Sequence, residues 1–71
     1  MKIKAGTLVT WISDSKIYTA KPGAQAVVTK DFIPEDEYID VEWIRNDLSG
    51  RQNNGGYHIT RFEVNDPAKL V

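Results

Sequence analysis

The chain contains no cysteine among its 71 residues and a single histidine. A disulfide therefore cannot brace the fold, and one imidazole alone cannot build a zinc centre. No run of residues approaches the roughly 18 consecutive apolar residues of a membrane-spanning helix. The first six residues lack the apolar stretch of a secretory signal peptide. These absences predict a soluble, cytoplasmic protein whose stability rests on packed aliphatic and aromatic side chains.

An excess of basic charge is also lacking, because nine lysines and arginines face ten acidic residues and leave a formal net charge of -1. Proteins that bind nucleic acid non-specifically usually carry a clear basic surplus. Charges of opposite sign alternate along the chain, as in Lys30-Asp31, which is typical of an ordinary solvated surface. A chain of this length forms one domain with a small core.

Three segments contain the alternation of apolar and polar residues that is typical of β-strands: Thr7–Ile12, Ala24–Ile33 and Glu37–Ile44. The third is the clearest and is predicted to be the central strand. Its residues Ile39, Val41 and Trp43 fall on one face, while Asp40 and Glu42 fall on the other. The first three are therefore expected to point into the core.

The remaining residues are rich in turn formers. Asn46–Gly56 holds amides and glycines with almost nothing to bury, so we expect a mobile hairpin loop. A short strand at Tyr57–Ile59, a tight turn at Thr60–Phe62 and an edge strand at Glu63–Asn65 follow, and the tail 66–71 is expected to fray. No segment shows the spacing of an amphipathic helix. Five short strands in an all-β domain close most readily as a small barrel.

Several features occur in a definite order: the strand Leu8–Ile12, the long loop Ser13–Pro22, Gly23 followed by Ala26-Val27-Val28, the segment Tyr38–Trp43, and Gly55-Gly56-Tyr57 leading to Phe62-Glu63. This order resembles the SH3-like barrels, especially KOW-type domains and small uncharacterised barrel proteins of phages and bacteria. The resemblance spans about residues 6–65 of a single domain, 1–71. It implies a five-stranded SH3-like barrel with a one-turn helix at Ile59–Phe62, before the last strand.

Three departures separate the chain from those families. It lacks the acidic cluster and paired aromatics with which SH3 domains bind proline-rich peptides, the basic surplus of ribosomal KOW proteins, and a partner domain. The resemblance therefore predicts the fold and carries no activity by itself.

No catalytic or cofactor site is expected. His58 has no partner in the sequence pattern, and Ser13, Ser15 and Ser49 lie in loops without a nucleophile elbow. An acidic run, Glu35-Asp36-Glu37, is better explained as a charged hairpin tip than as a metal site. The pair Gly55-Gly56 lacks the lysine and helix of a phosphate-binding loop. The sequence predicts a protein that is not an enzyme and binds no cofactor or metal.

Recognition of another protein is the leading functional prediction. Ile17 and Tyr18 are apolar residues in a loop that strand periodicity does not place in the core, and exposed apolar residues on a loop mark partner sites. An equally weighted alternative has Tyr18 folding back over the mouth of the barrel. The predicted protein-binding residues are Ile17, Tyr18, Lys16, Leu48 and Arg51. They suggest an adaptor, phage-encoded or accessory, that docks on a larger host protein.

The alternative is a KOW-like binder of RNA or single-stranded nucleic acid. Its predicted contacts are Arg45, Arg51, Asn53, Asn54, Tyr57, His58 and Arg61. Guanidinium and amide groups can pair with phosphates and base edges, and an aromatic ring can stack on a base. Against this, the arginines could simply balance the acidic residues Glu42, Asp47 and Glu63.

Overall fold

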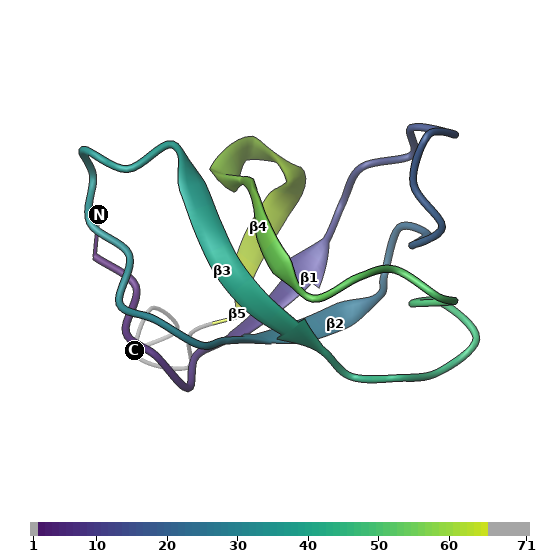
Figure 1. The fold of residues 1–71 in the computed structure, drawn as a ribbon, viewed down its shortest axis with the longest axis horizontal. Helices are drawn as coiled ribbons and strands as arrows, with labels where there is room; N and C mark the ends of the chain where they lie inside the picture. The colour runs from purple at the N-terminus through teal and green to yellow at the C-terminus, as the bar shows by residue number, and fades with distance from the viewer. Residues whose placement is uncertain (1, 66–71) are drawn as a thin grey trace.

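Five antiparallel strands form one sheet in the computed structural model, which describes residues 2–65 (Figure 1). The elements are β1 (Leu8–Trp11), β2 (Gln25–Val28), β3 (Tyr38–Trp43), β4 (Gly55–His58), the 3-10 turn η1 (Ile59–Arg61) and β5 (Phe62–Asn65). The strand order is β4-β3-β2-β1-β5. Five strands and a turn before the last one confirm the predicted all-β class. The predicted tail, 66–71, lies outside the described residues, and within the described part no helix is long and apolar enough to cross a membrane.

The predicted inward face of β3 is correct. Ile39, Val41 and Trp43 are buried, whereas Asp40 is half-buried and Glu42 is exposed. β3 is not the central strand, however, because the order places β2 in the middle of the sheet. The pairing of β2 with β3 sets Ala26 opposite Trp43 and Val28 opposite Val41. The small Ala26 thus leaves room for the large Trp43, and the equal side chains of Val28 and Val41 pack against each other across the strands.

β2 is much shorter than the predicted strand Ala24–Ile33. After Val28 the Thr29 backbone N–H donates to the Asp40 carbonyl at 2.9 Å, and the chain then leaves the sheet. Phe32 instead pairs with Ile3 through reciprocal backbone bonds of 3.0 and 2.7 Å. Both of these side chains are buried, and Ile33 turns outward. The N-terminal segment therefore closes one end of the core.

Trp11 is the centre of that core. It is fully buried, and its ring meets those of Tyr18, Trp43, Tyr57 and Phe62 in edge-to-face contacts with centroids 5.0 to 5.5 Å apart. Such pairs contribute about 0.5–1.5 kcal/mol each beyond the area they bury. The indole Nε1 is buried without a hydrogen-bond partner among the described residues. Aromatic packing, rather than a hydrogen bond, therefore holds the indole ring of Trp11 in place.

Candidate interaction surface

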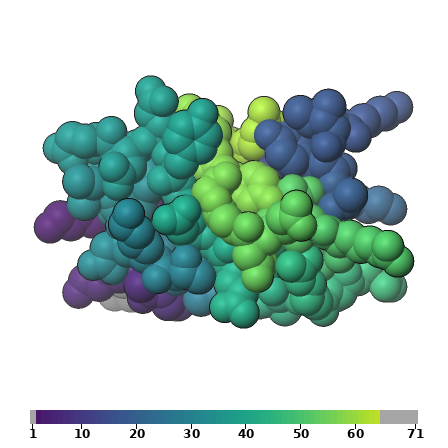
Figure 2. Space-filling model, viewed as in Figure 1, coloured from purple at the N-terminus to yellow at the C-terminus, as the bar shows by residue number. Residues whose placement is uncertain are grey.

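Two loops lie side by side at one end of the sheet: the β1–β2 loop (residues 12–24) and the β3–β4 loop (residues 44–54) (Figures 1 and 2). Gln52 ties them together. Its Oε1 accepts hydrogen bonds from the backbone N–H of Thr19 at 2.8 Å, from the Thr19 hydroxyl at 3.1 Å and from the Ala20 N–H at 3.2 Å. The Lys21 N–H adds a bond of 2.8 Å to the Leu48 carbonyl. The structure thus brings together the two loops from which the protein-binding residues were predicted.

The β3–β4 loop also has its own internal hydrogen bonds and one buried residue. The sequence had predicted a mobile loop with almost nothing to bury, so this framework was not expected. Asn46 Oδ1 accepts from the N–H groups of Leu48 at 2.8 Å and Ser49 at 3.1 Å. Ser49 is completely buried, and its hydroxyl bonds the backbone of Asn46 in both directions at 3.0 Å. A side chain that bonds the backbone two or three residues ahead stabilises a turn. The loop therefore has a defined shape before any partner binds.

Gly50 allows the two loops to approach. Its φ is +57°, in the left-handed region that favours glycine. A Cβ at this position would lie 3.1 Å from the Thr19 carbonyl oxygen. Both the backbone conformation and the close contact therefore require glycine here.

Tyr18 and Ile17 are neighbours in sequence, but one side chain packs against the core and the other is exposed. Tyr18 is half-buried, with its ring 5.0 Å from Trp11 and 6.0 Å from Tyr57. The Arg61 guanidinium covers its other side, 4.7 Å from the ring centroid, and bonds the Ser13 hydroxyl at 2.9 Å. Tyr18 therefore follows the second of the two alternatives and folds back onto the core. Ile17 projects into solvent with 80% of its surface exposed.

The other predicted protein-binding residues lie in the same two tied loops as Ile17. Lys16 and Arg51 are exposed, and neither forms a hydrogen bond or ion pair with any residue between 2 and 65. Leu48 is 40% exposed on the neighbouring loop. We call the exposed set Lys16, Ile17, Leu48 and Arg51 the loop-end surface. It combines two apolar side chains with two cationic ones.

Most residues of the predicted nucleic-acid site take part in internal contacts. Arg45 donates to the Gln52 carbonyl and to Asn54 Oδ1, and the same Oδ1 accepts from the Trp43 N–H at 2.9 Å. The Asn53 carbonyl accepts from Trp43 Nε1 at 2.9 Å and from the Tyr57 hydroxyl. These contacts fix the β3–β4 loop to the aromatic core.

His58 and Arg61 are similarly engaged. His58 Nδ1 accepts from the Thr60 N–H at 3.3 Å and so caps η1, while the ring packs against Tyr38 at 5.6 Å. Arg61 stacks on Tyr18. Within the described chain, Arg51 and the side-chain amide of Asn53 are the predicted nucleic-acid contacts that make no hydrogen bond. The proposed stacking ring, Tyr57, is half-buried among the other aromatics.

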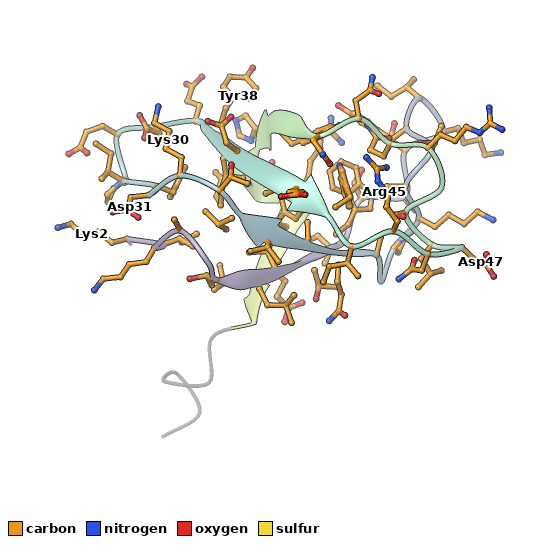
Figure 3. All side chains as sticks on the ribbon, turned by 60° about the horizontal axis from the view of Figure 1, so that its bottom comes forward. Lys2, Lys30, Asp31, Tyr38, Arg45 and Asp47 are labelled. Atoms are coloured by element: carbon orange, nitrogen blue, oxygen red, sulfur yellow. The ribbon has the colours of Figure 1, made fainter. Side chains whose placement is uncertain are left out.

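Both ends of the molecule carry charges of both signs, as the labelled Lys30 and Asp31 at one end and Arg45 and Asp47 at the other show (Figure 3), but in unequal numbers. The two tied loops and η1 carry five basic side chains, Lys16, Lys21, Arg45, Arg51 and Arg61, against two acidic ones, Asp14 and Asp47. At the opposite end, residues 29–40 carry five acidic side chains, Asp31, Glu35, Asp36, Glu37 and Asp40, against Lys30. Lys2 and Lys4 lie at the same end as this acidic segment, because Ile3 between them pairs with Phe32; Figure 3 labels Lys2 there. The charged side chains are exposed or half-buried, as expected of a solvated surface, but basic and acidic residues are unevenly distributed between the two ends because alternate connections of an antiparallel sheet gather at the same end.

The acidic end contains a cleft of about 260 Å³. Its walls come from the connection between β2 and β3 and from the start of β3: Lys30, Asp31, Phe32, Asp36, Glu37, Tyr38, Ile39 and Asp40. Tyr38 is 61% exposed. No three histidines or carboxylates of residues 2–65 are arranged to hold a metal ion. The cleft therefore offers an aromatic surface with acidic surroundings.

Comparison with protein families, with curated proteins and with solved structures gives no match.

Proposed function

We propose that the chain is an SH3-like barrel that acts as a non-catalytic protein-binding module. Its contact surface is the loop-end surface, and its role is that of an adaptor, phage-encoded or accessory, that docks on a larger host protein. The return of β5 to the side of β1 and the 3-10 turn before β5 support the barrel. Closure would occur between the two edge strands, β4 and β5, which η1 connects.

The exposure of Ile17 beside an anchored Tyr18 carries the proposal. An apolar side chain that is 80% exposed gains free energy when a partner covers it. Because Tyr18 and Gln52 hold the loop, little conformational entropy is lost when the partner binds. Arg51 and Lys16 add cationic groups at the edge, where charge guides the approach of the partner. A preformed apolar projection with a charged rim is the usual anatomy of a protein interface.

Affinity capture from the source cell tests this proposal. Ile17→Ser should reduce recovery of the partner by an amount equivalent to about 1–3 kcal/mol, as truncated interface anchors commonly do. Ile33→Ser is the matched control, since Ile33 is an exposed isoleucine at the opposite end. It should capture the partner as the wild type does. Equal recovery by the wild type and Ile17→Ser would remove the assignment.

The excess of basic residues at the same end favours a second candidate, binding of RNA or single-stranded nucleic acid. Lys16, Lys21 and Arg51 would supply phosphate contacts, because Arg45 and Arg61 already bond within the protein. Nuclease treatment before capture separates the two functions. A partner retained after treatment supports protein binding, and one that is released supports the nucleic-acid alternative.

A further inference from the structure

The two most exposed large apolar side chains of the described residues lie at opposite ends of the molecule. Ile17 is 80% exposed at the basic end, and Tyr38 is 61% exposed at the acidic end. Tyr38 lines the 260 Å³ cleft together with four carboxylates and one ammonium group, that of Lys30, so negative charge predominates there. Each apolar group is thus surrounded by charge of the sign opposite to that around the other.

We propose that the chain associates with itself head to tail, with the loop-end surface of one copy seated at the acidic cleft of the next. The inference rests on the proposed function of the loop-end surface and names a partner for it, a second copy of this chain. Ile17 packs against the exposed ring of Tyr38. Lys16 and Arg51 face the carboxylates of Asp36 and Glu37.

Charge and the composition of the cleft both favour a second copy. The basic loops and the acidic segment are complementary in sign, and like-charged ends disfavour head-to-head or tail-to-tail contacts. Four carboxylates together with Phe32, Tyr38 and Ile39 line the cleft, a composition that suits a long side chain with an apolar stem and a cationic head, such as Lys16 or Arg51. The contact joins two different surfaces, so each copy keeps one free end and assembly continues as an open chain unless it closes into a ring.

The contact is expected to be weak and sensitive to salt. Its charged groups lie at the surface, where interactions are screened over about 10 Å at 0.1 M salt. Sedimentation velocity of the wild type should therefore show a sedimentation coefficient that rises with protein concentration at low salt and rises much less at high salt.

Charge reversal provides the decisive variants. Lys16→Glu with Arg51→Glu makes both ends acidic, and Asp36→Lys with Glu37→Lys makes both ends basic. Each double variant alone should associate at least about tenfold more weakly than the wild type, because like charges then meet. An equimolar mixture of the two should recover association, since the unaltered cleft of the first variant meets the unaltered loops of the second. Glu42→Lys with Glu63→Lys is the matched control for the second double variant, because it raises the net charge by the same amount at exposed strand positions away from both ends, and it should associate like the wild type.

Circular dichroism establishes that each variant is folded before it is compared. The inference is overturned if the wild type sediments as a monomer at every concentration at low salt, or if the mixture behaves like its separate components. If the wild type is monomeric but captures another protein, and Ile17→Ser weakens that capture, self-association is refuted and the proposed function stands. A monomeric wild type, together with equal capture by the wild type and Ile17→Ser, would refute both the self-association and the proposed function.

Discussion

Replacing Tyr18 by alanine should destabilise the protein, although this residue lies in a loop. The ring makes two edge-to-face contacts, with Trp11 at 5.0 Å and Tyr57 at 6.0 Å, and supports the Arg61 guanidinium at 4.7 Å. Aromatic pairs contribute about 0.5–1.5 kcal/mol each, and a cation–π contact near the surface contributes about 0.5–1 kcal/mol. Because the ring is only half-buried, the total should stay below the roughly 3–5 kcal/mol of a fully buried aromatic residue. We expect a loss of about 2–3 kcal/mol.

Thermal unfolding followed by circular dichroism measures this effect. In a domain of this size a loss of 1 kcal/mol lowers the midpoint by about 4–8 °C, so Tyr18→Ala should melt at least about 8 °C below the wild type. Tyr18→Phe keeps the ring and should melt close to the wild type, since the Tyr18 hydroxyl makes no hydrogen bond among the described residues. Ile17→Ala, at the exposed neighbour, should change stability by no more than about 0.5 kcal/mol. Equal midpoints for Tyr18→Ala and Ile17→Ala would show that Tyr18 does not belong to the core.

Three further predictions follow from the sheet and the loops. Val41→Asp should abolish folding, because an unpaired buried carboxylate costs several kcal/mol of stability. Asp40→Val, on the opposite face of β3, should leave the circular dichroism spectrum of a folded protein. Loss of structure in both variants would mean that the faces are reversed. Gln52→Ala should lower the free energy of unfolding by about 1–3 kcal/mol and speed hydrogen exchange at the Thr19 and Ala20 amides, as measured by NMR. Unchanged exchange at these amides would show that Gln52 does not tie the loops. If nucleic acid is the ligand, fluorescence anisotropy with a labelled single strand should give a log–log salt slope of about -2, and binding unaffected by salt would exclude phosphate contacts.

Strand periodicity predicted the inner face of β3 because every second side chain of a strand must share a face. The same argument overextended β2, since apolar residues continue to Ile33 although the chain leaves the sheet after Val28. Phe32 is buried by pairing with Ile3, a contact between segments 29 positions apart that no local pattern encodes. Periodicity therefore describes the strands and misses the segments that close the ends of the core.

The candidate site was predictable only in part. Ile17 could be recognised as an apolar residue outside any strand, but the same reasoning applied equally to Tyr18. Only the three-dimensional structure shows that Tyr18 packs against Trp11 while Ile17 is exposed. Gln52 was not recognised as the link between the loops, because its partner Thr19 lies 33 positions away. The charged ends were hidden for the same reason, since alternating charges separate only after the chain has folded back on itself.

In-cell photocrosslinking tests the central claim most directly. A photoreactive phenylalanine analogue placed at position 17 should give a covalent adduct with a protein partner when the source cell is irradiated, because Ile17 lies at the centre of the proposed contact. The same analogue at position 42, an exposed strand position away from both ends, should give no such adduct with that partner. Adducts at position 42 with none at position 17 would contradict the loop-end surface as the site of protein binding.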